Sequence, residues 1–126
     1  MALHQAGETM LKEYQEKIIE LLAELEQEIA ILYRICAGVY ENRTDIWNAM
    51  ADEEFQHAEC VRELMEFAKG KKAIFDEKMT KTYTVNTVID KVKDMQNRVE
   101  SGEYSLIKML SLSYDLEQSI IERRFY

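Results

Sequence analysis

The chain has 126 residues with no proline, four glycines and a formal net charge of −8, from 16 basic and 24 acidic side chains. This length suits one domain with a single core, the composition predicts an all-α fold, and the acidic balance argues against a nucleic-acid partner. No run approaches the roughly 20 apolar residues of a membrane span, and the charged start lacks the apolar core of a signal peptide, so we expect a cytoplasmic protein without a membrane partner.

The hydrophobic pattern predicts a helical pair over about residues 7–70. The first helix should run from about Gly7 to Gly38, which is a plausible C-terminal stop. A polar turn through residues 41–44 offers N-cap candidates for the second helix, which should end near Gly70. The predicted inward side chains are Ile18, Leu22, Leu25, Ile29, Leu32 and Cys36 on the first helix, and Trp47, Met50, Ala51, Ala58, Val61, Met65 and Ala68 on the second.

The second half of the chain predicts a crossover connection with an extra helix over about residues 71–100, and a last helix over about 103–126. Charged, irregular sequence from Lys71 to Thr82 forms the connection, and Thr84 is a candidate cap for the extra helix. Ser101 and Gly102 separate the two helices. The expected inward side chains are Val85, Val88, Ile89, Val92, Met95 and Val99 on the extra helix, and Leu106, Leu110, Ser113, Ile120 and Ile121 on the last.

Carboxylates interrupt these apolar faces. At 100° per residue, Glu54 falls in the middle of the apolar face of its helix, and His57 lies one turn further along the same side. Glu117 interrupts the last helix in the same way. Because a buried, unpaired carboxylate destabilises a fold by several kcal/mol, a metal ion is the simplest compensation, and Glu-x-x-His is a ligand pair of di-iron helical bundles.

A further ligand is expected from the first helix. If the turn between the first two helices centres near Tyr40, antiparallel pairing places Glu26 level with Glu54. Glu28, at the opposite edge of the stripe, is the alternative ligand.

The stretch from Leu25 to Tyr33, followed by Trp47 and by Ala51 to Ala58 with its Glu54-x-x-His57 pair, resembles the first helical pair of rubrerythrin-like members of the ferritin-like superfamily. The resemblance implies a ferritin-like antiparallel helical bundle with long helices and a crossover connection. It also implies that Glu26, Glu54 and His57 bind iron, with manganese or zinc as alternatives. Glu54 would bridge a di-iron pair, and Tyr33 would be the catalytic aromatic residue beside the metals.

The sequence Leu25-Glu26-Gln27 recurs as Leu116-Glu117-Gln118, which makes Glu117 the counterpart of Glu26 and a fourth metal ligand. In the family pattern, a second Glu-x-x-His motif would follow Glu117 at the spacing that separates Glu54 from Glu26. That position lies beyond Tyr126. Arg124 also stands where Tyr33 has its counterpart, and this cation could neutralise Glu117 without a metal. Three interpretations follow: a chain truncated before its last helix, a site completed by another subunit, or a degenerate member. The first two predict a homo-oligomer, most simply a homodimer.

The resemblance implies a peroxide reductase or ferroxidase. Cys36 and Cys60 form no C-x-x-C pair, so a rubredoxin-type iron site is absent from the sequence and the electrons must come from an external donor. The alternatives are a non-catalytic helical assembly module with a vestigial metal site, and an iron storage or delivery protein.

Overall fold

A computed structural model describes residues 2–68 and 82–123 of the chain. In these residues every regular element is helical, as the composition predicted: α1 (Ala2–Val39), a short 3-10 turn η1 (Glu41–Arg43), α2 (Thr44–Ala68), α3 (Thr82–Glu100) and α4 (Leu106–Arg123). None of these helices combines the length and the hydropathy that a membrane span needs.

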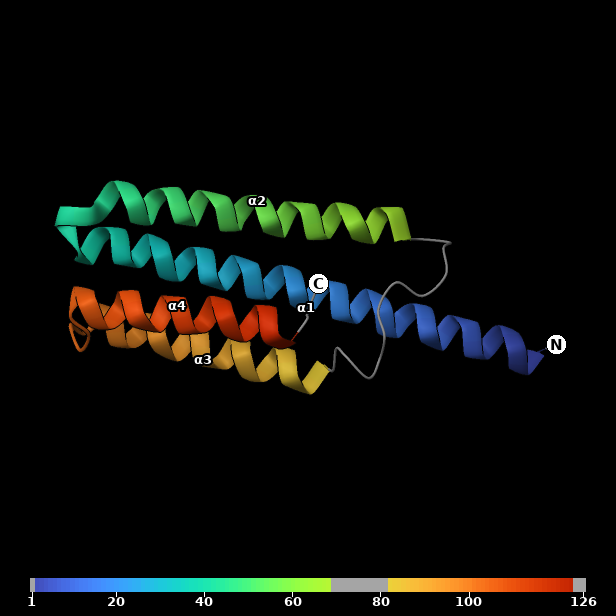
Figure 1. Cartoon of the computed structure of the whole chain (residues 1–126). Helices are drawn as coiled ribbons and strands as arrows, with labels where there is room; N and C mark the ends of the chain where they lie inside the picture. Colours follow the sequence, from blue (N-terminus) through green and yellow to red (C-terminus); the bar gives the residue numbers. More distant parts are fainter. Residues whose placement is uncertain (1, 69–81, 124–126) are drawn as a thin grey trace.

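Helices α1 and α2 form an antiparallel pair, and α1 is the central helix of the fold (Figure 1). The six side chains predicted for the inward stripe of α1 are all buried. On α2 the inward side chains Trp47, Ala51, Ala58 and Val61 are buried as predicted, and Met50 packs partly buried against them. The predicted helix end at Gly70 and the side chains of Met65 and Ala68 lie outside the described residues.

The turn between α1 and α2 lies where the sequence placed it. Helix α1 ends at Val39, one residue beyond the predicted stop, and η1 follows directly. The hydroxyl of Thr44 donates to the carbonyl oxygens of Ala37 and Glu41, at 2.9 and 3.1 Å. Thr44 therefore satisfies carbonyl groups at the end of α1 and in η1, rather than acting as the N-cap that the sequence suggested for α2.

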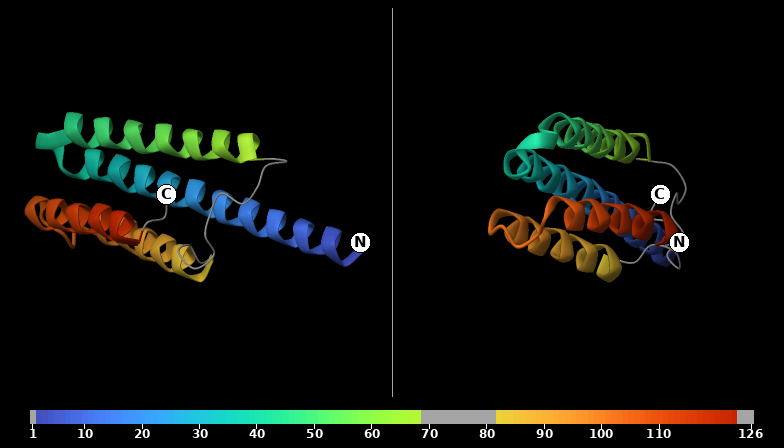
Figure 2. Two further views of the ribbon diagram at one scale, coloured as in Figure 1. Left: turned by 45° about the vertical axis from the view of Figure 1, so that its right-hand side comes forward. Right: turned by 60° about the vertical axis from the view of Figure 1, so that its left-hand side comes forward.

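Helix α3 packs against α1 on the side away from α2 (Figures 1 and 2). All six of its predicted inward side chains are buried. The helix begins at Thr82, so Thr84 lies inside it and the predicted cap at that position was wrong. The rest of the predicted connection, residues 71–81, lies outside the described part of the chain.

A tight turn joins α3 to α4. The amide of Gly102 donates to the carbonyl of Val99, and the amide of Glu103 donates to that of Arg98, both at 3.0 Å. These bonds make a Schellman motif, with Gly102 in the left-handed conformation at φ 75°. Ser105 then caps α4, because its hydroxyl oxygen accepts the amide of Lys108 at 3.1 Å. Helix α4 therefore begins at Leu106 and not near Glu103 as predicted.

The buried face of α4 differs from the predicted face. Ser113 and Ile120 are buried as expected, but Leu110 is 42% exposed and Met109 occupies the inward position instead. The side chain of Ile121 lies outside the description. Leu110, together with Ile107 and Tyr114, forms what we call the outer apolar face of α4.

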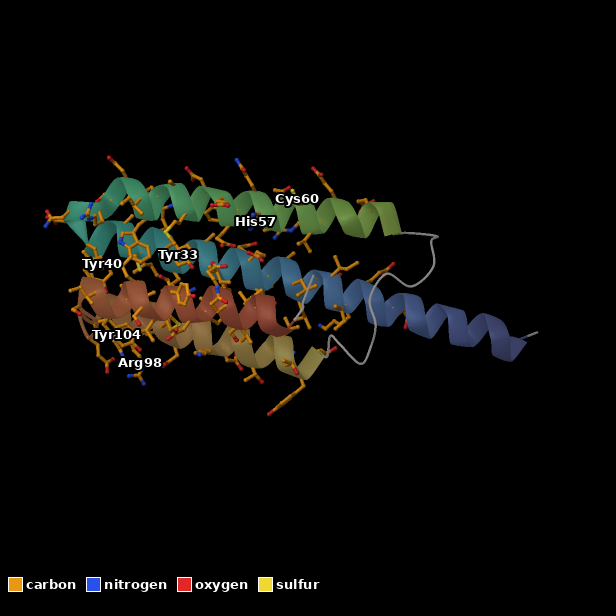
Figure 3. All side chains as sticks on the ribbon, viewed as in Figure 1. Tyr33, Tyr40, His57, Cys60, Arg98 and Tyr104 are labelled. Atoms are coloured by element: carbon orange, nitrogen blue, oxygen red, sulfur yellow. The ribbon has the colours of Figure 1, made fainter. Side chains whose placement is uncertain are left out.

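The two turns meet at the same end of the bundle. The phenol of Tyr40, at the α1–α2 turn, donates a 2.8 Å hydrogen bond to the carbonyl oxygen of Tyr104, at the α3–α4 turn (Figure 3). This bond links the two helical hairpins directly.

Candidate metal centre

Three potential metal ligands from α1 and α2 meet in the middle of the bundle. Glu26 of α1 and Glu54 and His57 of α2 each offer one ligand atom, and these atoms lie within 4.8 Å of one another. The His57 Nδ1 atom is 3.5 Å from Oε2 of Glu54 and 3.8 Å from Oε2 of Glu26. Antiparallel pairing around Tyr40 therefore brings Glu26 and Glu54 to the same height, as the sequence predicted.

Glu117 adds a third carboxylate from α4. Its side chain accepts a 2.8 Å hydrogen bond from the phenol of Tyr33, and it is close enough to Glu54 to raise the pKa of that carboxyl group. Glu26 raises the pKa of Glu54 in the same way. We call Glu26, Glu54 and Glu117 the carboxylate cluster; both other members act on Glu54.

Burial and mutual repulsion set the protonation of this cluster. The exposed fractions are 4% for Glu26 and 6% for Glu54. Burial, the hydrogen bond and charge of Glu26, and the charge and hydrogen bond of Glu117 together raise the pKa of Glu54 to about 11. Without a cation, Glu54 therefore carries a proton at neutral pH, and that proton allows it to donate to a neighbouring carboxylate.

The Tyr33 phenol is fully buried beside the cluster. Its pKa is raised above the ordinary value of 10.0, mainly by burial and then by the charge and hydrogen bond of Glu117. Tyr33 is thus a neutral hydrogen-bond donor that orients Glu117. Its position beside the cluster agrees with the predicted one, although sequence reasoning did not foresee Glu117 as its partner.

His57 lies at the rim of the site rather than in the buried interior that the sequence indicated. Its side chain is 50% exposed, because a residue three positions after Glu54 falls 60° short of a full helical turn. The Nδ1 atom faces the carboxylate cluster, while Nε2 lies 3.9 Å from the carboxylate of Glu53. A metal-binding imidazole commonly has a carboxylate on its other nitrogen. Sequence reasoning missed Glu53, although its i, i+4 spacing from His57 could have revealed it.

The structure places Glu26, and not the alternative Glu28, beside Glu54 and His57. The side-chain amide of Gln96 on α3 donates to the Glu28 carboxylate at 2.7 Å and to the Glu28 carbonyl at 2.9 Å. Glu28 thus faces α3, away from Glu54 and His57. Arg124, the cation considered as a partner for Glu117, lies outside the described residues.

This donor set fits a divalent cation of the iron, manganese or zinc kind, which bind carboxylate oxygen and imidazole nitrogen. The Oε2 atom of Glu54 is buried without a hydrogen-bond partner among the described residues, and it points to the same space as Nδ1 of His57. A buried acceptor of this kind destabilises the protein unless a donor or cation reaches it. A cation at this point would also relieve the repulsion within the cluster.

No family model, curated protein or solved structure matches this chain.

Proposed function

We propose that this chain is a rubrerythrin-like member of the ferritin-like superfamily that binds a di-iron pair and reacts with peroxide or dioxygen, as a peroxide reductase or ferroxidase. The observation that carries the proposal is the convergence of Glu26, Glu54 and His57 within 4.8 Å, two of them buried. Carboxylates on separate helices joined by a Glu-x-x-His pair form the ligand set of di-iron bundles.

Each side chain has a role in this proposal. Glu26 and His57 would hold one ion, Glu117 the other, and Glu54, whose pKa both other carboxylates raise, would be the carboxylate shared by the two ions. Glu54 must first release its proton, so metal binding at neutral pH is coupled to proton release. Bound iron would supply one-electron chemistry and open positions for dioxygen or peroxide.

The surrounding residues control access and geometry. Tyr33 fixes Glu117 through its hydrogen bond, so that an oxygen of this carboxylate keeps its direction toward the cluster. Buried apolar side chains on α1 and α2 exclude water from the inner side of the site. The half-exposed His57 leaves the outer side open to a small oxidant. Electrons for repeated turnover would come from an external donor.

The proposal includes a ferritin-like bundle with a crossover between α2 and α4, in which α3 is an additional helix. It also includes a homodimer or larger assembly. The outer apolar face of α4, on which Ile107 is 80% exposed and Tyr114 65%, supports assembly because such faces tend to be covered in a working protein. A second subunit that covers this face of α4 would lie close to Glu117 and would be placed to supply the remaining metal ligands.

The same outer face of α4 supports a second candidate, a non-catalytic assembly module in which the carboxylate cluster is vestigial. Iron storage or delivery without turnover is a variant of the main proposal, and it predicts metal uptake without peroxide consumption.

Metal analysis of protein purified from iron-supplemented medium tests these candidates. The di-iron proposal expects about two irons per complete site and peroxide consumption in the presence of a reductant. Both should be lost in Glu54→Gln and His57→Gln and kept in Glu20→Gln, which changes an exposed carboxylate on α1. Iron-free parent protein, or equal iron in all three variants, would leave the assembly module as the better interpretation.

A further inference from the structure

Three aromatic rings form a continuous row inside the bundle. The ring centroids of Tyr33 and Trp47 are 5.7 Å apart, and those of Trp47 and Tyr40 are 5.9 Å apart. Both separations are typical of aromatic side chains in direct contact. Tyr33 and Trp47 are fully buried, whereas Tyr40 is partly exposed. The row therefore leads from the interior to the surface.

The ends of this row have different surroundings. At one end, the phenol of Tyr33 donates to Glu117 in the carboxylate cluster. At the other, the phenol of Tyr40 donates to the carbonyl of Tyr104 at the turn end of the bundle (Figure 3). A surface hollow at this end is lined by Val39, Tyr40, Glu41, Asn42 and Leu106. The row thus connects the candidate metal centre with a recessed surface distant from His57.

Packing alone does not account for a tryptophan in the middle of the row. The Nε1 atom of Trp47 is buried and has no hydrogen-bond partner among the described residues. A buried donor without an acceptor destabilises a fold, and phenylalanine would fill an aromatic position without that group. Indole differs from the phenyl ring in losing an electron far more readily, and phenols share this property.

We propose that Tyr33, Trp47 and Tyr40 carry single electrons from a donor bound at the turn end into the metal centre. The inference rests on the proposed function, since the centre must be oxidised by peroxide or dioxygen to draw electrons. The donor belongs to the class of one-electron reductants, such as a reduced iron–sulfur or flavin protein. His57 offers small reductants a direct approach, so the row serves donors too large to enter there.

Each transfer balances in electrons and protons. Tyr33 gives one electron to the oxidised centre, and its phenolic proton passes along the hydrogen bond to Glu117. Trp47 then gives an electron to Tyr33, which takes its proton back from Glu117, and Trp47 becomes a radical cation that keeps its N–H. Tyr40 reduces Trp47 and releases its proton to water. The external donor finally supplies one electron to Tyr40, which recovers a proton from water.

Radical trapping tests the row independently of turnover. Iron-loaded protein is treated with hydrogen peroxide without a donor, frozen, and examined by electron paramagnetic resonance, with ring-deuterated tyrosine or tryptophan to identify the radical. We expect a tyrosyl radical on Tyr40 in the parent protein. In Trp47→Phe the radical should remain on Tyr33, and in Tyr40→Phe it should remain on Trp47 or Tyr33. Tyr114→Phe, which changes an exposed tyrosine outside the row, should match the parent.

Iron content measured on every sample separates the possible failures. If the parent binds iron but forms no radical on Tyr40, or forms one that persists in Trp47→Phe, the electron path is refuted while the metal site stands. If the parent binds no iron, the proposed function fails and the path fails with it. Tyr40→Phe removes one hydroxyl, which also bonds the carbonyl of Tyr104. With an iron content equal to that of the parent, this variant remains informative if Trp47→Phe does not fold. In Tyr40→Phe, a tyrosyl signal with the same hyperfine pattern as that of the parent would also refute the path, because the parent radical would then not lie on Tyr40.

Discussion

Replacing Glu54 with glutamine should stabilise the metal-free protein, increasingly so as the pH rises. In the folded state the pKa of Glu54 is raised from 4.5 to about 11 by burial and by its carboxylate neighbours. The folded protein therefore holds a proton that the unfolded chain releases above about pH 4.5. For a raised pKa, this contribution favours folding at low pH and is lost as the pH rises from 4.5 toward 11. Glutamine imitates the protonated carboxyl group at every pH and can donate to Glu26 and Glu117.

The size of the effect follows from the pH interval. One proton over about two pH units, from about pH 5.5 to about pH 7.5, corresponds to about 2.7 kcal/mol. Because the site opens to water beside the half-exposed His57, screening reduces this, and we expect about half, near 1.4 kcal/mol. The difference in melting temperature between Glu54→Gln and the parent should widen by about 5 °C over this interval.

Thermal unfolding of chelator-treated protein, followed by circular dichroism at both pH values, measures this difference. Glu63→Gln is the matched control, since it removes an exposed carboxylate from the same helix, and it should change little between the two pH values. A difference between Glu54→Gln and the parent that stays constant or shrinks as the pH rises would refute the protonated state of Glu54.

Further predictions concern metal binding, the cluster and the turns. Ferrous or manganous ions should raise the melting temperature of the parent by several degrees, and chelation should reverse this; His57→Gln should abolish the response, and an equal response in that variant would contradict the proposed ligand set. Tyr33→Phe should lower the free energy of unfolding by about 1–2 kcal/mol in urea titrations, because Glu117 loses its buried donor. Gly102→Ala should destabilise by about 1 kcal/mol, since Gly102 has φ 75°. Gly38→Ala, within α1 and with open space around the new methyl group, should instead stabilise by about 0.5–1 kcal/mol, as the same titrations would show.

The helical pair could be predicted from the sequence because it depends on short-range patterns, namely the spacing of apolar residues and the position of one polar turn. The apolar stripe of α1 has the helical period, and the polar turn near Tyr40 lies equally far from Glu26 and Glu54. Antiparallel pairing of two regular helices then determines which residues are level. This is why the sequence favours Glu26 over Glu28 as the partner of Glu54.

The sequence predictions failed where adjacent residues are equally apolar, where helical angles were approximated, and where a cap depends on backbone geometry. Met109 and Leu110 are adjacent, so hydropathy could not decide which of them faces inward, and packing selected Met109. His57 was predicted to be buried because its three-residue spacing from Glu54 was counted as a full helical turn, although it falls 60° short of one. The start of α4 was missed because the Ser105 cap depends on a backbone geometry that composition does not show.

The contacts of α4 with α1 and α2 were the least predictable part of the site. The internal repeat pointed to Glu117, but the hydrogen bond from Tyr33 joins residues separated by 84 positions. Such a contact depends on how the second hairpin docks on the first, and no local pattern encodes that docking. The aromatic row was missed for the same reason, since Trp47 and Tyr40 carry the apolar signature of ordinary packing.

The hydrogen bond between the Tyr40 phenol and the carbonyl of Tyr104 also bears on the position of Glu117. It anchors the second hairpin lengthwise on the first, and Glu117 lies on the helix that leaves this anchor. A slide of α4 by one turn would move Glu117 by about 5.4 Å, out of reach of both Tyr33 and Glu54. The Tyr40–Tyr104 hydrogen bond at the turn end of the bundle thus fixes the position of α4 along its axis and keeps Glu117 aligned with Glu26 and Glu54.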